Sequence, residues 1–287
     1  MRPASQHESH RRSENSMHTL PITLLVLTHN EAAFIARCLD SVPFADEKLI
    51  IDCGSTDGTR EIARAHGARV IEHEWLGFGP QRNFGSSQCS HNWVLALDAD
   101  EHLSKQLAQE LAQRLPTLME SDIAVGILRR RTLYMGAPMR WYKPMVGEKL
   151  ARLYHRDRAR WRDVRVHESL TWDGRQTSFT APFEHTNNPT LVHKGLKVLR
   201  YAELKARDWM QKGRKPRMWD CPVVFVSTFL KDYFIRRAVL DGWRGFIVSQ
   251  TNAAYAVYKR MRYYEMCRNS ESIELAANTL KRHELDR

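Results

Sequence analysis

Short apolar runs alternate with segments of helical periodicity along the first 115 residues. Buried strands are predicted where β-branched and other apolar residues run together, at 22–27, 48–52, 68–72 and 93–97. Helices are predicted between and after them, at 32–42, 59–67 and roughly 104–115, and residues 77–88 are predicted to be a loop that opens into a helix. Asn30 or Thr28 could cap the first helix, and Pro116 is expected to end the last one.

Strictly alternating strands and helices predict an α/β fold with a mostly parallel sheet and helices on both faces. In such sheets, ligands bind beyond the carboxyl ends of the strands. Polar residues follow the ends of the predicted strands: Asn30, Glu31, Asp52, Asp57, Asp98 and Asp100. We therefore expect these six side chains to converge on one cleft.

The rest of the chain divides into regions of different character. Residues 1–18 are polar and are predicted to be a disordered tail without a signal peptide, and Met17 could be the true start. Residues 19–193 form the predicted catalytic domain, with halves at 19–116 and 117–193, the second having β-like stretches. Residues 194–287 are predicted to be helical and basic, and no apolar run is long enough to span a membrane.

Charge and cysteine content narrow the choice of partners. The chain has 44 Lys and Arg against 33 Asp and Glu, a net charge of +11. Residues 19–193 carry 21 basic and 21 acidic side chains, whereas residues 194–287 carry 20 and 10. The C-terminal third should therefore favour an anionic partner. Five cysteines without a CxxC pair argue against disulfides and zinc, which fits a reducing cytosol.

Asp98 and Asp100 are the strongest chemical signal. Alternate residues of a strand point to one face, so two carboxylates at a strand end repel each other unless a cation lies between them. Mg²⁺ or Mn²⁺ prefers such oxygen ligands. The alternative is a solvated turn in which Asp100 or Glu101 caps the next helix. An EF-hand is excluded, because its glycine and its final glutamate are missing.

A second signal is the glycine-containing loop from Asp52 to Gly58. Its glycines allow close approach of the backbone to a ligand, and a carboxylate at a strand end can accept from a ribose hydroxyl or an N–H. The alternative is a tight turn with Asp57 as helix N-cap. The phosphate-binding G-x-x-x-x-G-K-[ST] and the dinucleotide-binding G-x-G-x-x-G are both absent.

The order of the motifs T-H-N-E, D-C-G-S-T-D-G-T, G-F-G-P-Q-R-N-F-G and L-D-A-D-E resembles the family 2 glycosyltransferases. The resemblance covers residues 20–115 closely and continues loosely through R-L-Y-H-R and V-H-E. It implies the GT-A nucleotide-sugar-binding fold. The wider pattern looks like the bacterial lipopolysaccharide-core β-1,4-glucosyltransferases of that family.

The resemblance also implies roles for single residues. Those expected around the donor nucleotide are Thr28, Asn30, Glu31, Asp52, Asp57, Gln81, Arg82, Asn83 and Asp98. Those expected at an Mg²⁺ or Mn²⁺ ion are Asp98, Asp100 and His185. Arg82 could instead be an ordinary surface ion-pair partner. Cys53 stands where the family often has a second acidic residue, and a small, partly buried thiol is expected there.

The implied reaction is inverting transfer of a sugar from a UDP-sugar to an acceptor hydroxyl, which needs one general base. Glu168 is the first candidate and Asp163 the second. An ion pair with Arg162 or Arg165 is the alternative for Glu168. His167 could orient the base or be structural. Glucose is expected from the subgroup, with galactose, N-acetylglucosamine or a heptose left open.

Residues 222–246 combine apolar and aromatic residues with Lys231, Arg236, Arg237 and Arg244. This mixture favours an anionic membrane surface and a lipid-linked saccharide acceptor, at the cytoplasmic face of the inner membrane. A core helix is the alternative. The acceptor could also be an exopolysaccharide, a polyprenyl phosphate or a protein. No nucleic-acid-binding motif is present, and the sequence does not predict the oligomeric state.

Two other functions lack the residues that they would need or would be expected to show. A nucleotidyltransferase would need a glycine-rich, lysine-containing loop after the first strand, and T-H-N-E is not such a loop. A non-catalytic binding protein built on a transferase fold would be expected to lack an acidic ligand. Asp52, Asp98 and Asp100 are all present.

Overall fold

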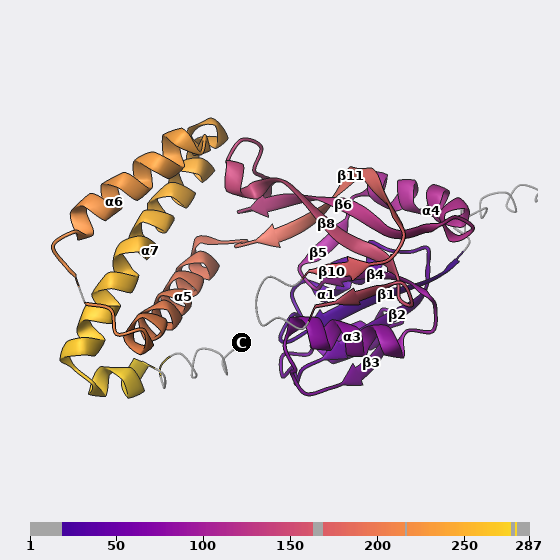
Figure 1. The fold of residues 1–287 in the computed structure, drawn as a ribbon, viewed down its shortest axis with the longest axis horizontal. Helices are drawn as coiled ribbons and strands as arrows, with labels where there is room; N and C mark the ends of the chain where they lie inside the picture. Colours follow the sequence, from indigo (N-terminus) through magenta and orange to yellow (C-terminus); the bar gives the residue numbers. More distant parts are fainter. Residues whose placement is uncertain (1–18, 163–168, 216, 277–278, 280–287) are drawn as a thin grey trace, which may run out of the picture.

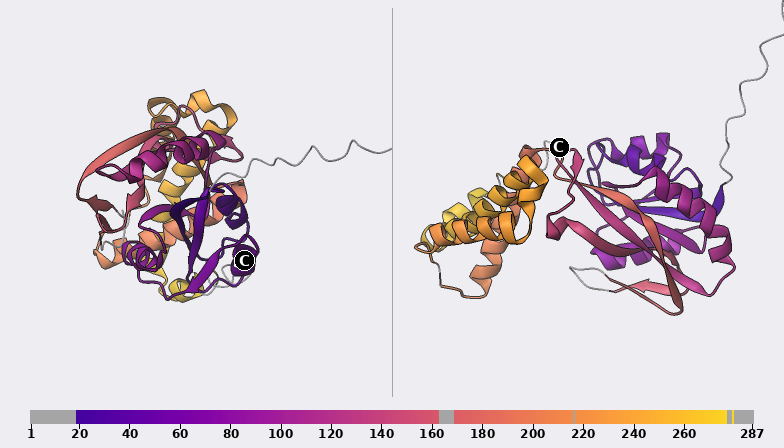
Figure 2. Two further views of the ribbon diagram at one scale, coloured as in Figure 1. Left: turned by 90° about the vertical axis from the view of Figure 1, so that its right-hand side faces the viewer. Right: turned by 90° about the horizontal axis from the view of Figure 1, so that it is seen from above.

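Two units make up the part of the chain that the computed structural model describes, which is residues 19–162, 169–215, 217–276 and 279. The sheet unit comprises residues 19–187 and the helical unit residues 191–276 (Figure 1). The helical unit lies to one side of the sheet rather than over it, as the views of Figure 2 show. The predicted tail at 1–18 falls outside the described residues.

The sheet has the predicted parallel core. Strands β1 (Leu20–Thr28), β2 (Ala45–Asp52), β3 (Arg69–Glu72) and β4 (Trp93–Asp98) pair in parallel in the order β3-β2-β1-β4. The register aligns Thr28 with Asp52 and Leu27 with Asp98. The carboxyl ends of these strands therefore meet at one edge, and the α/β fold class is confirmed.

Two apolar cores hold helices against both faces of this sheet. Helices α1 (Ile35–Asp40), α2 (Thr59–Ala65) and α4 (Lys105–Met119) contribute to one core. Helix α3 (Phe78–Gln88) and the hairpin of β9 (Ala159–Trp161) and β10 (Leu170–Trp172) cover the opposite face. Buried aliphatic side chains from consecutive strand residues, such as Leu24 and Leu25, feed both cores, which explains the uninterrupted apolar runs of the sequence.

The prediction that Pro116 ends the fourth helix is wrong. Helix α4 starts where the Ser104 side chain accepts the N–H of Leu107, and it continues through Pro116 to Met119. Proline lacks one N–H, but near the last turn this removes only one hydrogen bond. Leu115 and Leu118 are buried on the core side, so packing favours the extra turn.

Beyond β4 the sheet continues in the order β8, β6, β11 and β5, with both antiparallel and parallel pairs. Strand β8 (Val146–His155) pairs antiparallel with β4 and with β6 (Ile123–Tyr134), which pairs with the short β7 (Ala137–Pro138). Strand β11 (Arg175–Asn187) runs parallel to β6 and antiparallel to β5 (Glu101–Leu103). This last pairing carries the end of β11 to the segment that follows β4.

Long helices and short turns make up most of the described part of the helical unit. Helices α5 (Leu191–Gln211) and α6 (Cys221–Leu230) both pack against α7 (Gly242–Arg268), and a π-helical turn η2 (Lys231–Ile235) and a 3₁₀ turn η3 (Ala238–Asp241) connect α6 to α7. In the described part of the chain, no helix has the length and apolar character needed to cross a bilayer.

Helix α6 is not a buried core helix, which was the alternative for this segment. Of its ten residues only Cys221 is buried, while Val223 and Val226 are exposed by 67% and 54%. Two of the expected membrane arginines have contacts within the protein. Arg236 pairs with Asp232, and Arg244 donates to the Met135 carbonyl.

A few polar contacts join the two units. The Asp241 carboxylate accepts the backbone N–H groups of Arg140, Trp141 and Tyr142, at 2.8, 3.1 and 2.8 Å. These residues precede the 3₁₀ turn η1 (Lys143–Met145). The Tyr142 hydroxyl donates to the buried Asp232. The helical unit is thus fixed to the far end of strand β6 through backbone and buried groups.

Candidate active site

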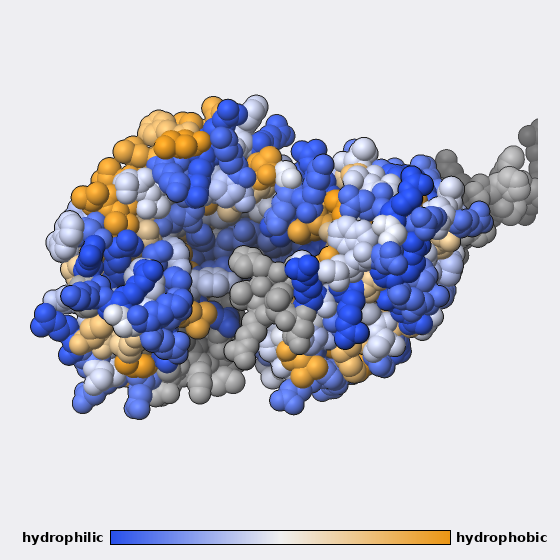
Figure 3. Space-filling view, in the orientation of Figure 1, coloured by the Kyte–Doolittle hydropathy of each residue, from blue (hydrophilic) through white to orange (hydrophobic). Residues whose placement is uncertain are grey.

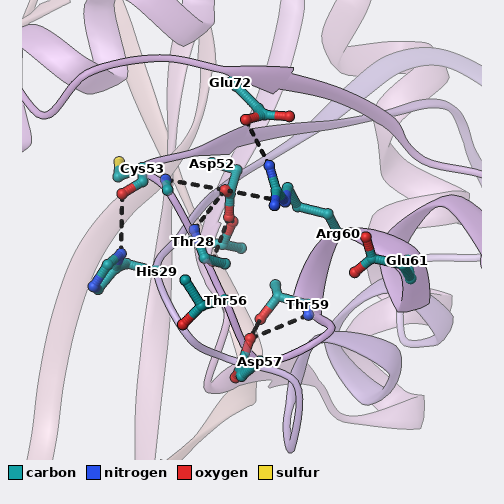
Figure 4. A network of polar contacts seen from close by, with 12 residues as sticks. Thr28, His29, Asp52, Cys53, Thr56, Asp57, Thr59, Arg60, Glu61 and Glu72 are labelled. Atoms are coloured by element: carbon teal, nitrogen blue, oxygen red, sulfur yellow. Dashed lines mark hydrogen bonds and ion pairs between the residues drawn. The ribbon is translucent and has the colours of Figure 1, made fainter. Parts of the chain in front are cut away.

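Asp52, at the end of β2, is the centre of a hydrogen-bond network that Figure 4 draws. One carboxylate oxygen accepts the N–H groups of Gly54 and Ser55 at 3.1 and 2.9 Å, and the other accepts the hydroxyls of Thr28 and Ser55. The Asp52 side chain is fully buried. With four donors already in place, Asp52 shapes the loop on which a ligand would rest.

The loops after β1 and β2 are also bonded to each other. Asn30 adopts a left-handed conformation, with φ 57°, and its side-chain oxygen accepts the N–H of Thr56 at 2.8 Å. Asp57 accepts the N–H of Ala32 through one oxygen and that of Thr59 through the other. The prediction that Asn30 or Thr28 caps the first helix is wrong, because α1 has no side-chain cap and both residues bond to the β2 loop.

Three consecutive residues of α3 each reach a different neighbour. Gln81 contacts His73 and donates to the Cys53 sulfur, and Asn83 exchanges two hydrogen bonds with the backbone of Trp161. Gln81 and Asn83 thereby join α3 to the β2 loop and to strand β9. The Cys53 thiol is partly buried, as expected, and burial raises its pKa to about 11.

Arg82, the middle residue of the three, is fully buried and pairs with Asp98 at 2.5 Å, so the alternative of a surface ion pair is wrong. The second oxygen of Asp98 accepts from Arg152 at 2.8 Å, and Arg152 also binds the buried Glu101 at 2.7 Å. Burial raises the pKa of Asp98, but the guanidinium groups of Arg152 and Arg82 outweigh it and hold that pKa well below its usual range.

Arg152 and Glu101 are functional neighbours that the sequence analysis did not assign. Arg152 opens the string R-L-Y-H-R, and Glu101 closes L-D-A-D-E, so both signals were visible. An arginine and a glutamate at strand positions are normally solvent-facing, and their burial became clear only with the pairing of β8 beside β4.

Asp100 and His185 meet across two strands that are far apart in the sequence. The Nε2 atom of His185 lies 3.2 Å from Asp100 Oδ2, and the side chains are partly exposed. The position is fixed by backbone contacts, since His185 pairs with Glu101 in the β5–β11 ladder and Thr186 N–H donates to the Asp100 carbonyl. Two of the three predicted metal ligands therefore lie together.

These two side chains fit a small divalent cation. Adjacent ligands at the 2.0–2.1 Å distances of an octahedral ion lie about 3 Å apart, close to the observed separation. A carboxylate and an imidazole suit Mn²⁺ or Mg²⁺ with further oxygen ligands from substrate. Among the described residues no three His, Cys, Asp or Glu side chains converge as a complete metal site. Asp98, with both oxygens taken by arginines, lies next to the pair.

Glu31 lies in the same electrostatic field. Burial, followed by the nearby charges of Asp100, Asp57 and Asp98, raises the pKa of Glu31 to about 7. The exposed Lys197, on α5 of the helical unit, acts in the opposite direction. The sequence analysis did not single out Lys197, because its position beside the site depends on how the two units are joined.

Several site predictions remain untested by geometry. The two candidate bases, Glu168 and Asp163, and the neighbouring His167 lie outside the described residues.

In Figure 3 a hollow lined by hydrophilic residues separates the helical unit from the sheet unit. The sheet unit contributes the strand ends, the Asp52 loop and the Asp100–His185 pair.

Comparison with known proteins gives consistent matches. The profile of glycosyl transferase family 2 matches residues 23–169. An uncharacterized glycosyltransferase of Rickettsia prowazekii is 30% identical over 240 residues, covering 79% of this chain and 81% of its own. The lipopolysaccharide core biosynthesis glycosyltransferase LpsC of Rhizobium meliloti is 28% identical over 86% of this chain and 93% of its own. The S. aureus TarS 1–349 structure aligns over 87% of this chain and 92% of its own, at 15% identity with a TM-score of 0.43.

Proposed function

Because the chain belongs to glycosyl transferase family 2 and is a glycosyltransferase, we propose that it transfers a sugar from a UDP-sugar to a lipid-linked saccharide with inversion at the anomeric carbon. The observation that carries this proposal is the Asp100–His185 pair at the carboxyl edge of the sheet. Glu31 and the Asp52 loop flank the same edge, where parallel sheets bind their ligands.

In this proposal the donor nucleoside rests on the loops after β1 and β2. Asp52, Asn30 and Asp57 position those loops through the hydrogen bonds described above, and exposed backbone and Glu31 contact the nucleoside. Because the loops are already cross-bonded, little conformational entropy is lost when the donor binds. Asp98, held between Arg82 and Arg152, keeps the adjacent strand end rigid.

Asp100 and His185 would hold a divalent cation against the donor diphosphate. Such a cation supplies electrostatic stabilisation of the negative charge that develops on the leaving diphosphate. Lys197 adds a positive charge on the opposite wall, from the helical unit. Asp100 and His185 would hold the cation, and the diphosphate of the donor would supply further oxygen ligands.

Glu168 is proposed as the general base that removes the proton from the acceptor hydroxyl, with Asp163 as the second candidate. Both belong to the stretch that follows β9, and β9 is bonded to α3 through Asn83. One base suffices, because the departing diphosphate needs no proton. Direct attack on the face opposite the leaving group inverts the anomeric carbon.

The proposed acceptor is a lipopolysaccharide core, and the proposed sugar is glucose. Similarity to LpsC, which is named for lipopolysaccharide core biosynthesis, supports this acceptor. The alternative acceptors are an exopolysaccharide, a polyprenyl phosphate and a protein, and each can be offered in place of the core in the transfer assay described below. The proposed location is the cytoplasmic face of the inner membrane, to which the protein binds peripherally.

The exposed apolar face of α6 and η2 supports peripheral membrane binding. Val223, Val226 and Leu230 lie on α6, and Ile235 follows on η2 with 70% exposure. Hydrophobic residues gather over α6 at the outer edge of the helical unit in Figure 3. An apolar face flanked by exposed cations such as Lys231 suits the interface of an anionic bilayer.

The decisive experiment measures UDP release from a panel of UDP-sugars with Mn²⁺, with and without a purified lipopolysaccharide core acceptor. Acceptor-dependent release from UDP-glucose, with a product of inverted configuration by NMR, is the expected result. Release that is confined to another nucleotide sugar would reject the donor, and indifference to the core acceptor would reject the acceptor.

A further inference from the structure

A second concave surface lies in the helical unit, at the opposite end of α5 from the candidate active site. Lys197 is near Glu31, whereas Trp209, twelve residues later on the same helix, lines a cavity of about 380 Å³. At 1.5 Å per residue the two positions are about 18 Å apart. The connection from α5 to α6 and the side of α7 complete the cavity, which we name the α5–α7 pocket.

Four cationic side chains line the α5–α7 pocket: Arg214, Lys215, Arg217 and Arg260. Within the described residues, only Arg260 has an ion-pair partner, Asp220 at 3.5 Å. Asp220 is also the one acidic residue of the lining. Like charges that share a concavity repel one another unless an anion neutralises them, so this arrangement indicates a negatively charged ligand.

Backbone contacts hold this cluster in place. The Tyr263 hydroxyl donates to the carbonyl of Arg214, and the N–H of Arg214 donates to the carbonyl of Trp209. The Arg214 guanidinium lies 5.3 Å from the centre of the Trp209 ring and that of Arg260 lies 5.8 Å from it. Packing against one indole orders two of the four cations before a ligand arrives.

Two features specify more than a bare anion. One oxygen of Asp220 is buried and has no hydrogen-bond partner among the described residues, so it calls for a donor such as a hydroxyl group. The aromatic rings of Trp209 and Tyr263 supply an apolar wall. Hydroxyls, an apolar ring face and a phosphate occur together in a phosphorylated sugar.

We propose that the α5–α7 pocket binds a phosphorylated saccharide, with the phosphate held by Arg214, Lys215 and Arg217 and a sugar hydroxyl donating to Asp220. This site is separate from the donor site, and its occupancy does not require transfer activity. A phosphate on a lipid headgroup presents the same anionic chemistry, so the experiment must distinguish a sugar from a lipid as its carrier.

The test is calorimetric titration of the full chain with glucose 6-phosphate, inorganic phosphate, glucose and the water-soluble lipid dihexanoyl phosphatidic acid. Saturating UDP and Mn²⁺ are present to fill the donor site. We expect one glucose 6-phosphate per chain, bound about tenfold more tightly than inorganic phosphate, and no measurable binding of glucose.

The variants separate specific binding from general charge. Lys215→Gln combined with Arg217→Gln removes two exposed cations of the pocket and should weaken glucose 6-phosphate binding about tenfold or more. Lys212→Gln removes one positive charge a few residues away, outside the pocket lining, and should change binding little. Asp220→Asn should reduce the preference for glucose 6-phosphate over inorganic phosphate several-fold.

Three results would overturn the proposal. Equal losses in Lys212→Gln and in the pocket variant would mean that net charge alone attracts phosphate. Glucose 6-phosphate binding that appears only when UDP is left out would assign the binding to the donor site. Binding of dihexanoyl phosphatidic acid as tight as that of glucose 6-phosphate, unaffected by Asp220→Asn, would replace the saccharide by a lipid headgroup. Unchanged UDP affinity and circular dichroism show that each variant is folded.

Discussion

The sheet unit and the helical unit differ in whether their clustered charged side chains have partners within the protein. At the carboxyl edge of the sheet, Asp52 has four donors and Asp98 has two arginines. In the α5–α7 pocket, cations such as Lys215 and Arg217 share a concavity without an acidic partner among the described residues. A charge that the protein satisfies itself serves shape, whereas an unsatisfied cluster indicates a ligand. Glu31, which is surrounded by the carboxylates of Asp100, Asp57 and Asp98, belongs to the second kind although it lies in the sheet unit.

The largest effect is expected at the candidate base. Glu168→Gln should lower turnover by about 10²–10⁴-fold, the usual contribution of one general base, with nearly unchanged UDP affinity. Asp163→Asn, changed in the same way five residues earlier, serves as the matched variant. Transfer rates and UDP binding are measured for both. Normal turnover in Glu168→Gln, or a loss entirely in donor affinity, would move the role to Asp163 or elsewhere.

Asp100→Asn should lower turnover by about 10²-fold while the fold survives, because it removes the negative charge of a partly exposed ligand. The readout is UDP release across a Mn²⁺ titration, in which the variant should require more metal. Asp57→Asn is the control and should keep the wild-type metal dependence, because this loop carboxylate accepts hydrogen bonds from the backbone of Ala32 and from Thr59 and is not part of the Asp100–His185 pair. Wild-type activity that persists in EDTA would contradict the metal site.

Asp98→Ala should lower the free energy of unfolding rather than the metal affinity. The buried Arg82 loses the carboxylate with which it pairs. The cost is about 2–4 kcal/mol, which is less than for a fully buried ion pair, because the Asp98 side chain is partly exposed to water. Asp208→Asn, which removes a partly exposed carboxylate paired with two lysines of the helical unit, should change stability little. Urea unfolding of both variants measures the difference, and equal losses would break the contrast between the units.

The apolar face of α6 gives a smaller effect. Val226→Ser combined with Ile235→Ser should reduce partitioning to anionic vesicles about thirtyfold, because each exposed aliphatic side chain contributes about 1 kcal/mol when it enters the interface. Leu275→Ser removes an equally exposed apolar side chain elsewhere in the helical unit and is the control. High salt should weaken binding further. Unaltered sedimentation of the double variant would reject the proposed face.

The smallest effect concerns pH. Burial raises the pKa of Glu47, but hydrogen bonds from Thr23, Ser90 and Arg69 outweigh it and lower the pKa to about 2. Since the unfolded value is 4.5, this stabilisation is complete above pH 4.5 and is lost as the pH falls toward 2. Glu47→Gln should flatten the dependence of unfolding free energy on pH in that window. If the unfolding free energy of the variant depended on pH in the same way as that of the wild type, the assignment to Glu47 would be contradicted.

Much of the sheet unit could be predicted from sequence because its signals are local. Apolar runs such as 22–27 mark buried parallel strands, and polar residues after them mark the ligand edge of the sheet. The meeting of Asp100 with His185 could not be derived from spacing, because it depends on the pairing of β11 with β5. It was implied by the family resemblance, and the distance of 3.2 Å agrees with that implication.

Other features could not be predicted, because the type of a residue does not show how deeply its side chain is buried. Arg82 and Arg152 carry charge, and a charged residue in sequence suggests solvent, yet both are buried beside Asp98. For α6 the sequence left two options open, because an apolar stretch suits a buried core and an exposed face equally well, and only the structure shows that it is exposed. In both cases the outcome depends on neighbours that are distant in sequence, and a single sequence contains no record of them.

The three hydrogen bonds to Asp241 have a consequence for dynamics. One carboxylate of the helical unit covers the consecutive amides of Arg140, Trp141 and Tyr142 in the sheet unit. These amides lie outside the ladder bonds of regular strands, so their exchange with deuterated solvent is slow only while the two units stay joined. Their exchange rate therefore measures how stable the contact between the two units is, without any label on the protein.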